Sequence, residues 1–185
     1  AYAGVRQEAR SRNDRSAEGH AIQSSGEIHM RLGNLDTARG LFDESRARFE
    51  ADNDQASVGR VWQAAALTDL LAWRFGPAEQ EYGKSSTACA LAKEPECVAR
   101  ATVGLAFAQA SQSHFDDAIV TYGKAIAAFT AVKKPGDAAR AELGLSQAQY
   151  GKKEYMAALV SAGRAQLAGA ALRDQDLVWR ARVAE

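Results

Sequence analysis

The sequence has few prolines and no excess of charged residues of either sign. Only three prolines occur in 185 residues, and because proline interrupts the hydrogen-bond ladder of a helix, their scarcity permits long helices. Ala, Glu, Gln, Arg and Leu are abundant, and these side chains lose little rotamer freedom in a helix. The composition therefore predicts an all-α protein.

The balance of charge also limits the partners that we expect. Lys and Arg together number 23, as do Asp and Glu, so no overall field attracts nucleic acid or an anionic membrane. No segment reaches the roughly 18 consecutive apolar residues of a membrane span, and the first residues lack the pattern of a signal peptide. We expect no nucleic-acid partner, no membrane contact and a cytoplasmic location. Because both ends lie inside helical patterns, we also expect a fragment of a larger protein.

Residues suited to catalysis or metal binding are scarce. Two cysteines are too few for a disulfide scaffold, and the Ala-rich surroundings of Cys89 predict a free thiol that fills a small core position. The three histidines, His20, His29 and His114, lack the spacing that places two zinc ligands on one helix face. No strand precedes a Gly-rich phosphate loop or a nucleophile elbow. The sequence thus predicts a protein that is not an enzyme and has no metal or cofactor.

What the sequence does contain is an internal repeat, the feature that most strongly predicts the fold. Large residues recur with a period of 40, and each is followed three positions later by alanine: Leu35 and Ala38, Phe75 and Ala78, Phe115 and Ala118, Tyr155 and Ala158. A column of small residues precedes them: Gly26, Ala66, Ala106 and Ser146. Small residues let two helices approach closely while large side chains fill the space beside them. Each unit is therefore predicted to be two antiparallel helices, A and then B.

Residues typical of turns and caps separate these helices. Between A and B we expect turns at Gly33-Asn34, Gly76-Pro77, Ser113-His114 and Gly151-Lys152. Glycine and asparagine tolerate left-handed backbone, and proline can open a helix. Between units, the acidic residues of 52–54, 94–96 and 134–137 end helix B and offer a cap to the next helix A.

At this point the sequence resembles the tetratricopeptide family, whose helix-turn-helix unit is usually about 34 residues long. The match is carried by His114–Ala125 (HFDDAIVTYGKA), Gly33–Ala38 (GNLDTA), Lys153–Ala158 (KEYMAA) and, in part, Arg74–Ala78 (RFGPA). The longer period of this chain is similar to the long-repeat arrays of kinesin light chains, of bacterial regulators and of CHAT-type proteases. The resemblance implies a right-handed α-solenoid of antiparallel helix pairs and a role in protein binding.

This phase divides the chain into one array. The predicted parts are a truncated helix B at 1–15, complete repeats at 16–55, 56–95, 96–135 and 136–175, and a truncated helix A at 176–185. An array that stops in mid-unit leaves an apolar helix face at each end.

In the family that the chain resembles, helix A lines the concave face, and this implies a candidate binding groove. Its residues are Arg60, Arg100, Arg140, Arg180, Gln63, Leu67, Phe107, Gln147 and Tyr150. The four arginines recur with the period of the repeat and form a ladder able to bind carboxylates or phosphates. The alternative is pairing within each helix, because Glu96, Asp137 and Asp176 precede three of them by three or four residues. With Leu67 and Phe107 as an apolar middle, the groove would suit an amphipathic helix or an acidic peptide.

The predicted function is a non-catalytic protein–protein interaction scaffold that binds a peptide, a helix or a neighbouring domain. The positions that match the carboxylate clamp of chaperone-tail binders hold Gln23, Gln63, Val103 and Leu143, so this chain lacks that clamp. One alternative is a regulatory or sensor arm that controls an enzymatic or DNA-binding domain outside this sequence. A second is a self-assembly element that associates end to end.

Overall fold

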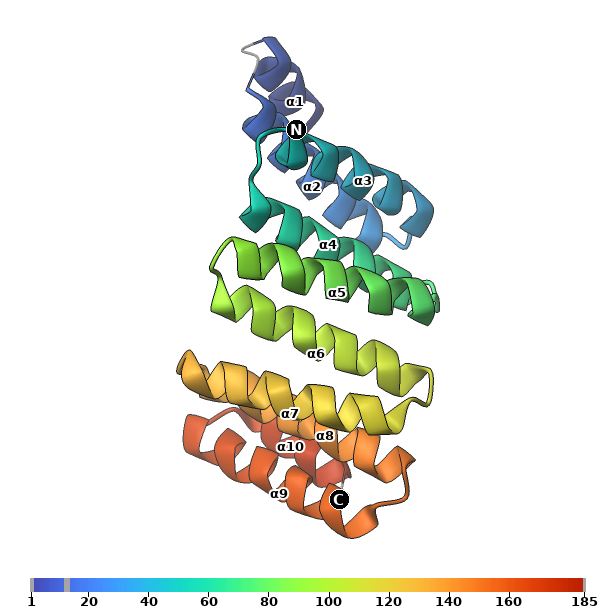
Figure 1. Cartoon of the computed structure of the whole chain (residues 1–185), viewed down its shortest axis with the longest axis vertical. Coiled ribbons are helices and arrows are strands. Elements are labelled where there is room, and N and C mark those ends of the chain that lie inside the picture. Colours follow the sequence, from blue (N-terminus) through green and yellow to red (C-terminus); the bar gives the residue numbers. More distant parts are fainter. Residues whose placement is uncertain (1, 12–13, 185) are drawn as a thin grey trace. The chain divides into compact units, whose positions relative to one another are not determined.

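The computed structural model describes residues 2–11 and 14–184, and all the regular secondary structure in these ranges is helical. The helices are α1 (Tyr2–Ser11), α2 (Arg15–Arg31), α3 (Leu35–Ala51), α4 (Gln55–Leu71), α5 (Phe75–Leu91), α6 (Pro95–Ser111), α7 (Phe115–Ala131), α8 (Pro135–Gly151), α9 (Tyr155–Leu172) and α10 (Gln175–Ala184) (Figure 1). No helix in this part of the chain is both long and apolar enough to cross a membrane.

From α2 onward the helices begin at evenly spaced positions, so two of them fill each period of the repeat. A residue with positive φ follows the end of each of these helices before α10: Gly33, Asn53, Trp73, Lys93, Ser113, Lys133, Lys153 and Arg173. Only glycine and, less readily, asparagine adopt this left-handed conformation without a steric cost. The sharp reversal of the chain therefore recurs even where the local residue type does not favour it.

The predicted turn at Gly76-Pro77 is wrong. Both residues lie in the first turn of α5, where the missing N–H of proline has no partner within the helix to lose. Trp73, with φ of 60°, makes the reversal instead. Likewise Gly151 is the last residue of α8, and Lys153 has the left-handed backbone.

Aspartates cap three of the A helices, and one of them, Asp54, lies in a segment that the sequence predicted to cap a helix. The side chain of Asp14 accepts a hydrogen bond from the Ala17 N–H at 2.9 Å. Asp54 accepts one from Ser57 and Asp174 one from Leu177, both at 3.0 Å. Each bond satisfies one of the backbone N–H groups that have no partner at the start of a helix.

The chain forms two compact units, Ala1–Cys97 and Val98–Glu185. In the first unit, consecutive helices from α1 to α5 pack together around Phe42, Phe49, Val58 and Val61. The small-residue column works as predicted, because a Cβ at Gly26 would lie 2.8 Å from the Phe42 ring.

The second unit packs α6 to α10 around smaller side chains. Its core joins Ala106 of α6 to Tyr122 of α7 and Leu145 of α8, and a further cluster centres on Leu177. Gly144 of α8 lies against Tyr122, and a Cβ there would meet that ring at 2.5 Å. Close approach of α7 and α8 therefore requires glycine at this position.

The free thiol predicted for Cys89 is wrong. Cys89 is fully buried, but its sulfur atom is bonded to that of Cys97 in the first turn of α6. The reversal after α5 brings the two Cα atoms to 5.6 Å, within the range that a disulfide spans. The spacing of the two cysteines in the sequence does not show that they meet, because only the turn between the helices places them together.

Candidate functional site

The predicted arginine ladder is exposed in both units, and Arg60, Arg140 and Arg180 pair with acidic side chains. In the first unit, Arg60 of α4 donates to both carboxylate oxygens of Glu94 at 3.2 Å and to the Ser57 hydroxyl at 3.1 Å. Glu94 immediately precedes α6. Arg60 thus links the first turn of one A helix to the residue before the next.

The same link occurs in the second unit. Arg140 of α8 donates to Asp174, just before α10, at 3.0 Å and also to Asp137 at 3.4 Å. Both long-range pairs join residues at the same sequence separation. These two pairs were not predicted from the sequence. The signal that could have revealed them is the acidic residue before each of these A helices, which recurs with the period of the repeat. Such exposed pairs contribute only tenths of a kcal/mol, so a ligand carboxylate can compete for the arginines.

Arg180 of α10 pairs with Asp176 at 3.0 Å, one turn earlier in the same helix. Arg100 lies exposed on α6. The structure therefore contains pairing within a helix and pairing between helices, and neither arrangement buries the guanidinium groups.

A groove in the second unit brings three of the predicted site residues together. It has a volume of about 390 Å³ and lies between α8 and α10. Its lining consists of Ser146, Gln147, Tyr150, Arg180, Val183 and Ala184. The Tyr150 ring also packs edge to face on Tyr155, with the centroids 5.4 Å apart. A guanidinium, an amide and an apolar wall thus face one cavity.

The other predicted residues lie elsewhere. Phe107 is half exposed on α6, and Leu67 is similarly exposed on α4. Gln63 is half-buried, and its amide donates to the Cys97 carbonyl oxygen at 3.1 Å. Gln63 therefore holds the start of α6, a contact that its position in the repeat did not indicate.

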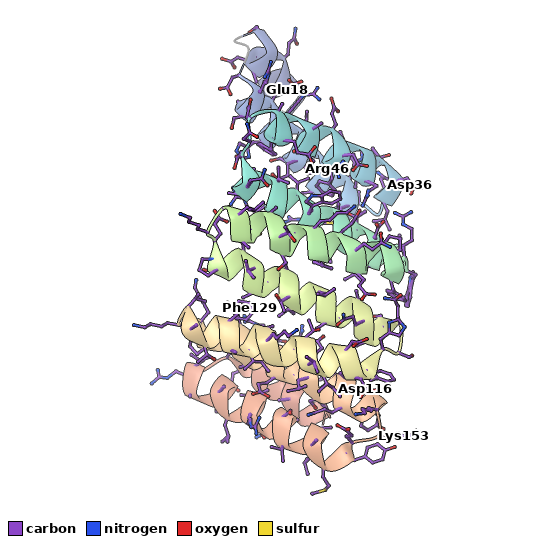
Figure 2. All side chains as sticks on the ribbon, in the orientation of Figure 1. Glu18, Asp36, Arg46, Asp116, Phe129 and Lys153 are labelled. Atoms are coloured by element: carbon purple, nitrogen blue, oxygen red, sulfur yellow. A yellow bond between two sulfur atoms is a disulfide. The ribbon has the colours of Figure 1, made fainter. Side chains whose placement is uncertain are left out.

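A buried ionic network in the first unit is a feature that sequence reasoning missed. Asp69 of α4 and Glu81 of α5 are only 3 % and 4 % exposed. Arg39 of α3 pairs with both carboxylates, at 3.2 Å for Asp69. Arg74 adds a bond of 2.8 Å to Asp69 and one of 3.2 Å to Asp36, which is labelled in Figure 2.

Burial raises the pKa of Glu81, and the pairing with Arg39 opposes this shift. A charged group inside a protein must keep its partners, because an unpaired charge there is costly. The network ties α3, α4 and α5 together through side chains that are mostly buried. We therefore interpret it as structural.

The fold and the groove define a class of protein. Helices that pair in sequence order, with small residues between them and a new pair in each period of the repeat, make this a tetratricopeptide-like helical repeat. Similarity to solved repeat structures confirms the predicted all-α fold class and the tetratricopeptide resemblance.

Three solved structures illustrate this similarity. BtubC (BKLC) from P. vanneervenii aligns with a TM-score of 0.78 and 16 % identity over 87 % of this chain and 66 % of its own. Aspartyl phosphate phosphatase F from Bacillus subtilis aligns with a TM-score of 0.86 and 14 % identity over 92 % of this chain and 45 % of its own. At these identities the likeness shows the fold alone.

The third structure is a Signal Transduction ATPase with Numerous Domains (STAND) protein with a tetratricopeptide repeat sensor, from Pyrococcus horikoshii. Its TM-score is 0.83 and its identity 15 %, over 92 % of this chain and 27 % of its own. This chain thus spans from about a quarter to about two thirds of the length of these three structures. No protein-family model and no curated protein matches the sequence.

Proposed function

We propose that this chain is a protein-interaction module whose second unit binds an extended segment of a partner protein in the groove between α8 and α10. The observation that carries the proposal is the lining of that groove by Gln147, Tyr150 and Arg180. Peptide-binding sites of this kind combine an apolar pocket with a few polar groups that orient the ligand.

The chemistry of the groove specifies the ligand further. The Tyr150 ring and Val183 offer apolar surface, and Arg180 offers a guanidinium that is mostly exposed. Tyrosine and arginine are the residue types that most often dominate binding energy at protein interfaces. The proposed ligand is therefore a segment with one large apolar side chain followed or preceded by a carboxylate. Arg140 and Arg100 extend the basic ladder along the A helices of the same unit.

A displayed library of random peptides, selected on the whole chain, tests this proposal. Selected peptides are labelled, and their affinities are measured by fluorescence anisotropy for the parent, Arg180→Glu and Tyr150→Ala. We expect each variant to bind at least about 30-fold more weakly, which corresponds to a loss of about 2 kcal/mol for an interface hot spot.

The matched control is Lys124→Glu, which reverses one exposed positive charge on α7, outside the groove. It should bind like the parent, and all variants should keep the parent's helical circular dichroism. Equal affinity in the parent and both groove variants would remove this groove from the proposal. Capture from a lysate with the parent and with Arg100→Glu/Arg140→Glu then tests whether the ladder is needed for a natural partner.

A regulatory or sensor arm is the second candidate function. It is favoured by the likeness to the STAND protein, whose tetratricopeptide repeats are described as a sensor, and by the short span of this chain on it. In that case the ligand of the groove would be another domain of the same polypeptide. The native reading frame would reveal such a domain, and its absence would contradict this candidate.

Association end to end is a third candidate, supported by exposed apolar side chains on α9, including Met156, Leu159 and Leu167. Sedimentation velocity over a wide range of concentration would reveal it as an increase in mass. A constant monomer mass would contradict it.

A cytoplasmic location is part of the proposal, and the disulfide offers a test of it. Disulfides are rare in the cytosol of most organisms because thiols are kept reduced there. We propose to trap free thiols with an alkylating reagent in the source cells and to count the labelled cysteines by mass spectrometry. Two alkylated thiols would fit the cytoplasm, whereas an intact Cys89–Cys97 bond would contradict that location.

A further inference from the structure

The two units differ at a helix-A position that faces two B helices. In the first unit this position holds Trp62 of α4, which packs against the core of that unit. The Arg46 guanidinium of α3 lies 4.0 Å from the centre of the Trp62 ring, and the Lys84 ammonium of α5 lies 4.6 Å from it. Cationic side chains of α3 and α5 therefore both contact the indole.

Two periods of the repeat later, the corresponding positions in the second unit carry different side chains. Ile126 of α7 replaces Arg46, Glu142 of α8 replaces Trp62, and Arg164 of α9 replaces Lys84. A carboxylate is much smaller than an indole, and here the structure has a cavity of about 310 Å³. Its walls include Ile126, Pro135, Ala138, Glu142, Arg164 and Ala168. The second unit thus retains the space that an indole occupies in the first.

The carboxylate in this cavity is poorly satisfied. The Glu142 side chain is only 14 % exposed, and its Oε2 atom is buried without a hydrogen-bond partner. Its other oxygen lies 3.6 Å from Arg164, too long for a strong hydrogen bond. Burial also raises the pKa of Glu142, while Arg164 opposes that shift. This second oxygen is not among the buried atoms, so it can accept a hydrogen bond from the N–H group of a ligand in the cavity.

The charges around the cavity select the kind of donor. Besides Arg164, the cation Lys133 lines it, against the single carboxylate of Glu142. A cationic ligand such as a lysine or arginine side chain would be repelled by this excess of positive charge. A neutral, flat and apolar group that carries one N–H donor avoids this repulsion and fits the alanine and proline walls. Among protein side chains, the indole of tryptophan has these properties.

We propose that this cavity binds a tryptophan side chain of a partner polypeptide. The ring contacts Ile126 and Arg164, as the ring of Trp62 contacts Arg46 and Lys84, and its N–H donates to the Glu142 carboxylate. The guanidinium of Arg164 stacks on the ring face, a favourable cation–π contact. The site is lined by α7, α8 and α9, whereas the groove of the proposed function is lined by α8 and α10. The two proposals can therefore fail independently.

N-acetyltryptophanamide is the probe for the test, and the readout is the backbone amide spectrum of the ¹⁵N-labelled whole chain. We expect saturable shifts at Ala138, Glu142 and Ala168, with a dissociation constant in the millimolar range, as for a small ligand with few atoms. N-acetylphenylalaninamide lacks the N–H donor of the indole ring and should bind about 5-fold more weakly. N-acetyllysinamide should not bind.

Glu142→Trp supplies the indole from the chain itself and should abolish probe binding while the protein stays folded. Asp117→Trp is the matched control, since it makes the same change in charge and a similar change in size at an exposed position of α7 outside the cavity. It should bind the probe like the parent.

Three results would overturn the proposal. They are shifts confined to residues outside the cavity, equal affinity for the tryptophan and phenylalanine probes, and retained binding in Glu142→Trp. A fourth result, preferential binding of the lysine probe, would also overturn the proposal, because it would indicate a cation site in place of the indole site.

Discussion

The two units share one backbone design and differ in what they bury. In the first unit, three charged residues, Arg39, Asp69 and Glu81, pair across α3, α4 and α5. Two periods later the second unit has Ile119, Gln149 and Ser161 at these positions. There the Ser161 hydroxyl donates to the Gln149 amide oxygen at 2.8 Å. One interior contact is thus ionic in one unit and neutral in the other.

A second set of ion pairs also differs between the two units. In the first unit, Arg74 connects Asp36 to Asp69. In the second, Lys152 connects Asp116 to Glu154, at 2.6 and 2.8 Å. This fold therefore specifies the small and large positions between helices, whereas the polar pairs beside them vary. A change at a polar pair should therefore be tolerated when the whole pair is exchanged, and it should be costly when one member is removed.

The largest expected effect comes from removing the central cation of the ionic network. Arg39→Ile leaves Asp69 and Glu81 buried without that partner, and we expect a loss of about 3 kcal/mol in the free energy of unfolding. Urea denaturation followed by circular dichroism measures this loss. A change below about 1 kcal/mol would show that the network contributes little.

The exchange of the whole set tests the comparison itself. Arg39→Ile/Asp69→Gln/Glu81→Ser copies the second unit, and replacement of a buried ion group by neutral residues is often neutral or stabilising. We expect stability within about 1 kcal/mol of the parent. If the triple variant is less stable than Arg39→Ile alone, the two sets of positions are not equivalent.

A smaller effect is expected where helices approach closely. Gly144→Ala places a Cβ 2.5 Å from the Tyr122 ring and should cost about 1–3 kcal/mol by overpacking. Gly163→Ala is the matched control in the same unit, because no atom lies within 4 Å of its added Cβ. It should instead stabilise α9 by about 0.5–1 kcal/mol. Thermal melts of the two variants would contradict this interpretation if both shifted in the same direction.

Helix caps give a third contrast between the units. Asp54 caps α4, whereas the equivalent residue before α8, Lys134, makes no side-chain cap. We expect Asp54→Ala to lower the free energy of unfolding by about 1 kcal/mol and Lys134→Asp to raise it by a similar amount. Chemical denaturation at neutral pH measures both changes.

The Asp54 cap should also depend on pH. Burial tends to raise the pKa of Asp54, but hydrogen bonds from Ser57 and the charge of Arg60 outweigh this effect and lower the pKa below that of an ordinary aspartate. A lowered folded pKa means that the stabilisation is present above the unfolded pKa and is lost as the pH falls through the folded value. The difference in the free energy of unfolding between Asp54→Ala and the parent should therefore shrink in acid. A difference that stays constant with pH would exclude the Asp54 carboxylate as its source.

The smallest effect concerns the left-handed residues that end the helices. Lys153 has a φ of 69° in the second unit, where the equivalent residue near the start of the chain is Gly33. Lys153→Gly should stabilise the protein by about 0.5–1 kcal/mol, and Gly33→Ala should destabilise it by a similar amount. Melting temperatures of the two variants should move in opposite directions.

Much of the fold could be predicted because its signal is periodic. The columns of Gly26 and of Ala38 with their equivalents mark where helices touch, and the structure buries both. The candidate site was less predictable. Gln147, Tyr150 and Arg180 line one groove, but Gln63 bonds to Cys97. A repeat position specifies a face of a helix, whereas the partner of a polar side chain depends on which neighbours reach it.

The helical class, the period of the repeat and the alternation of small and large side chains between paired helices can all be predicted from the sequence. These follow from local propensity and from volume, which each residue carries with it. Three features could be seen only in the tertiary structure: which charges meet in the first unit, the bond between Cys89 and Cys97, and the cavity beside Glu142. At the equivalent position of the first unit, the indole of Trp62 takes the place of Glu142. Those outcomes depend on distances between helices that are remote in sequence, and no residue type encodes them alone.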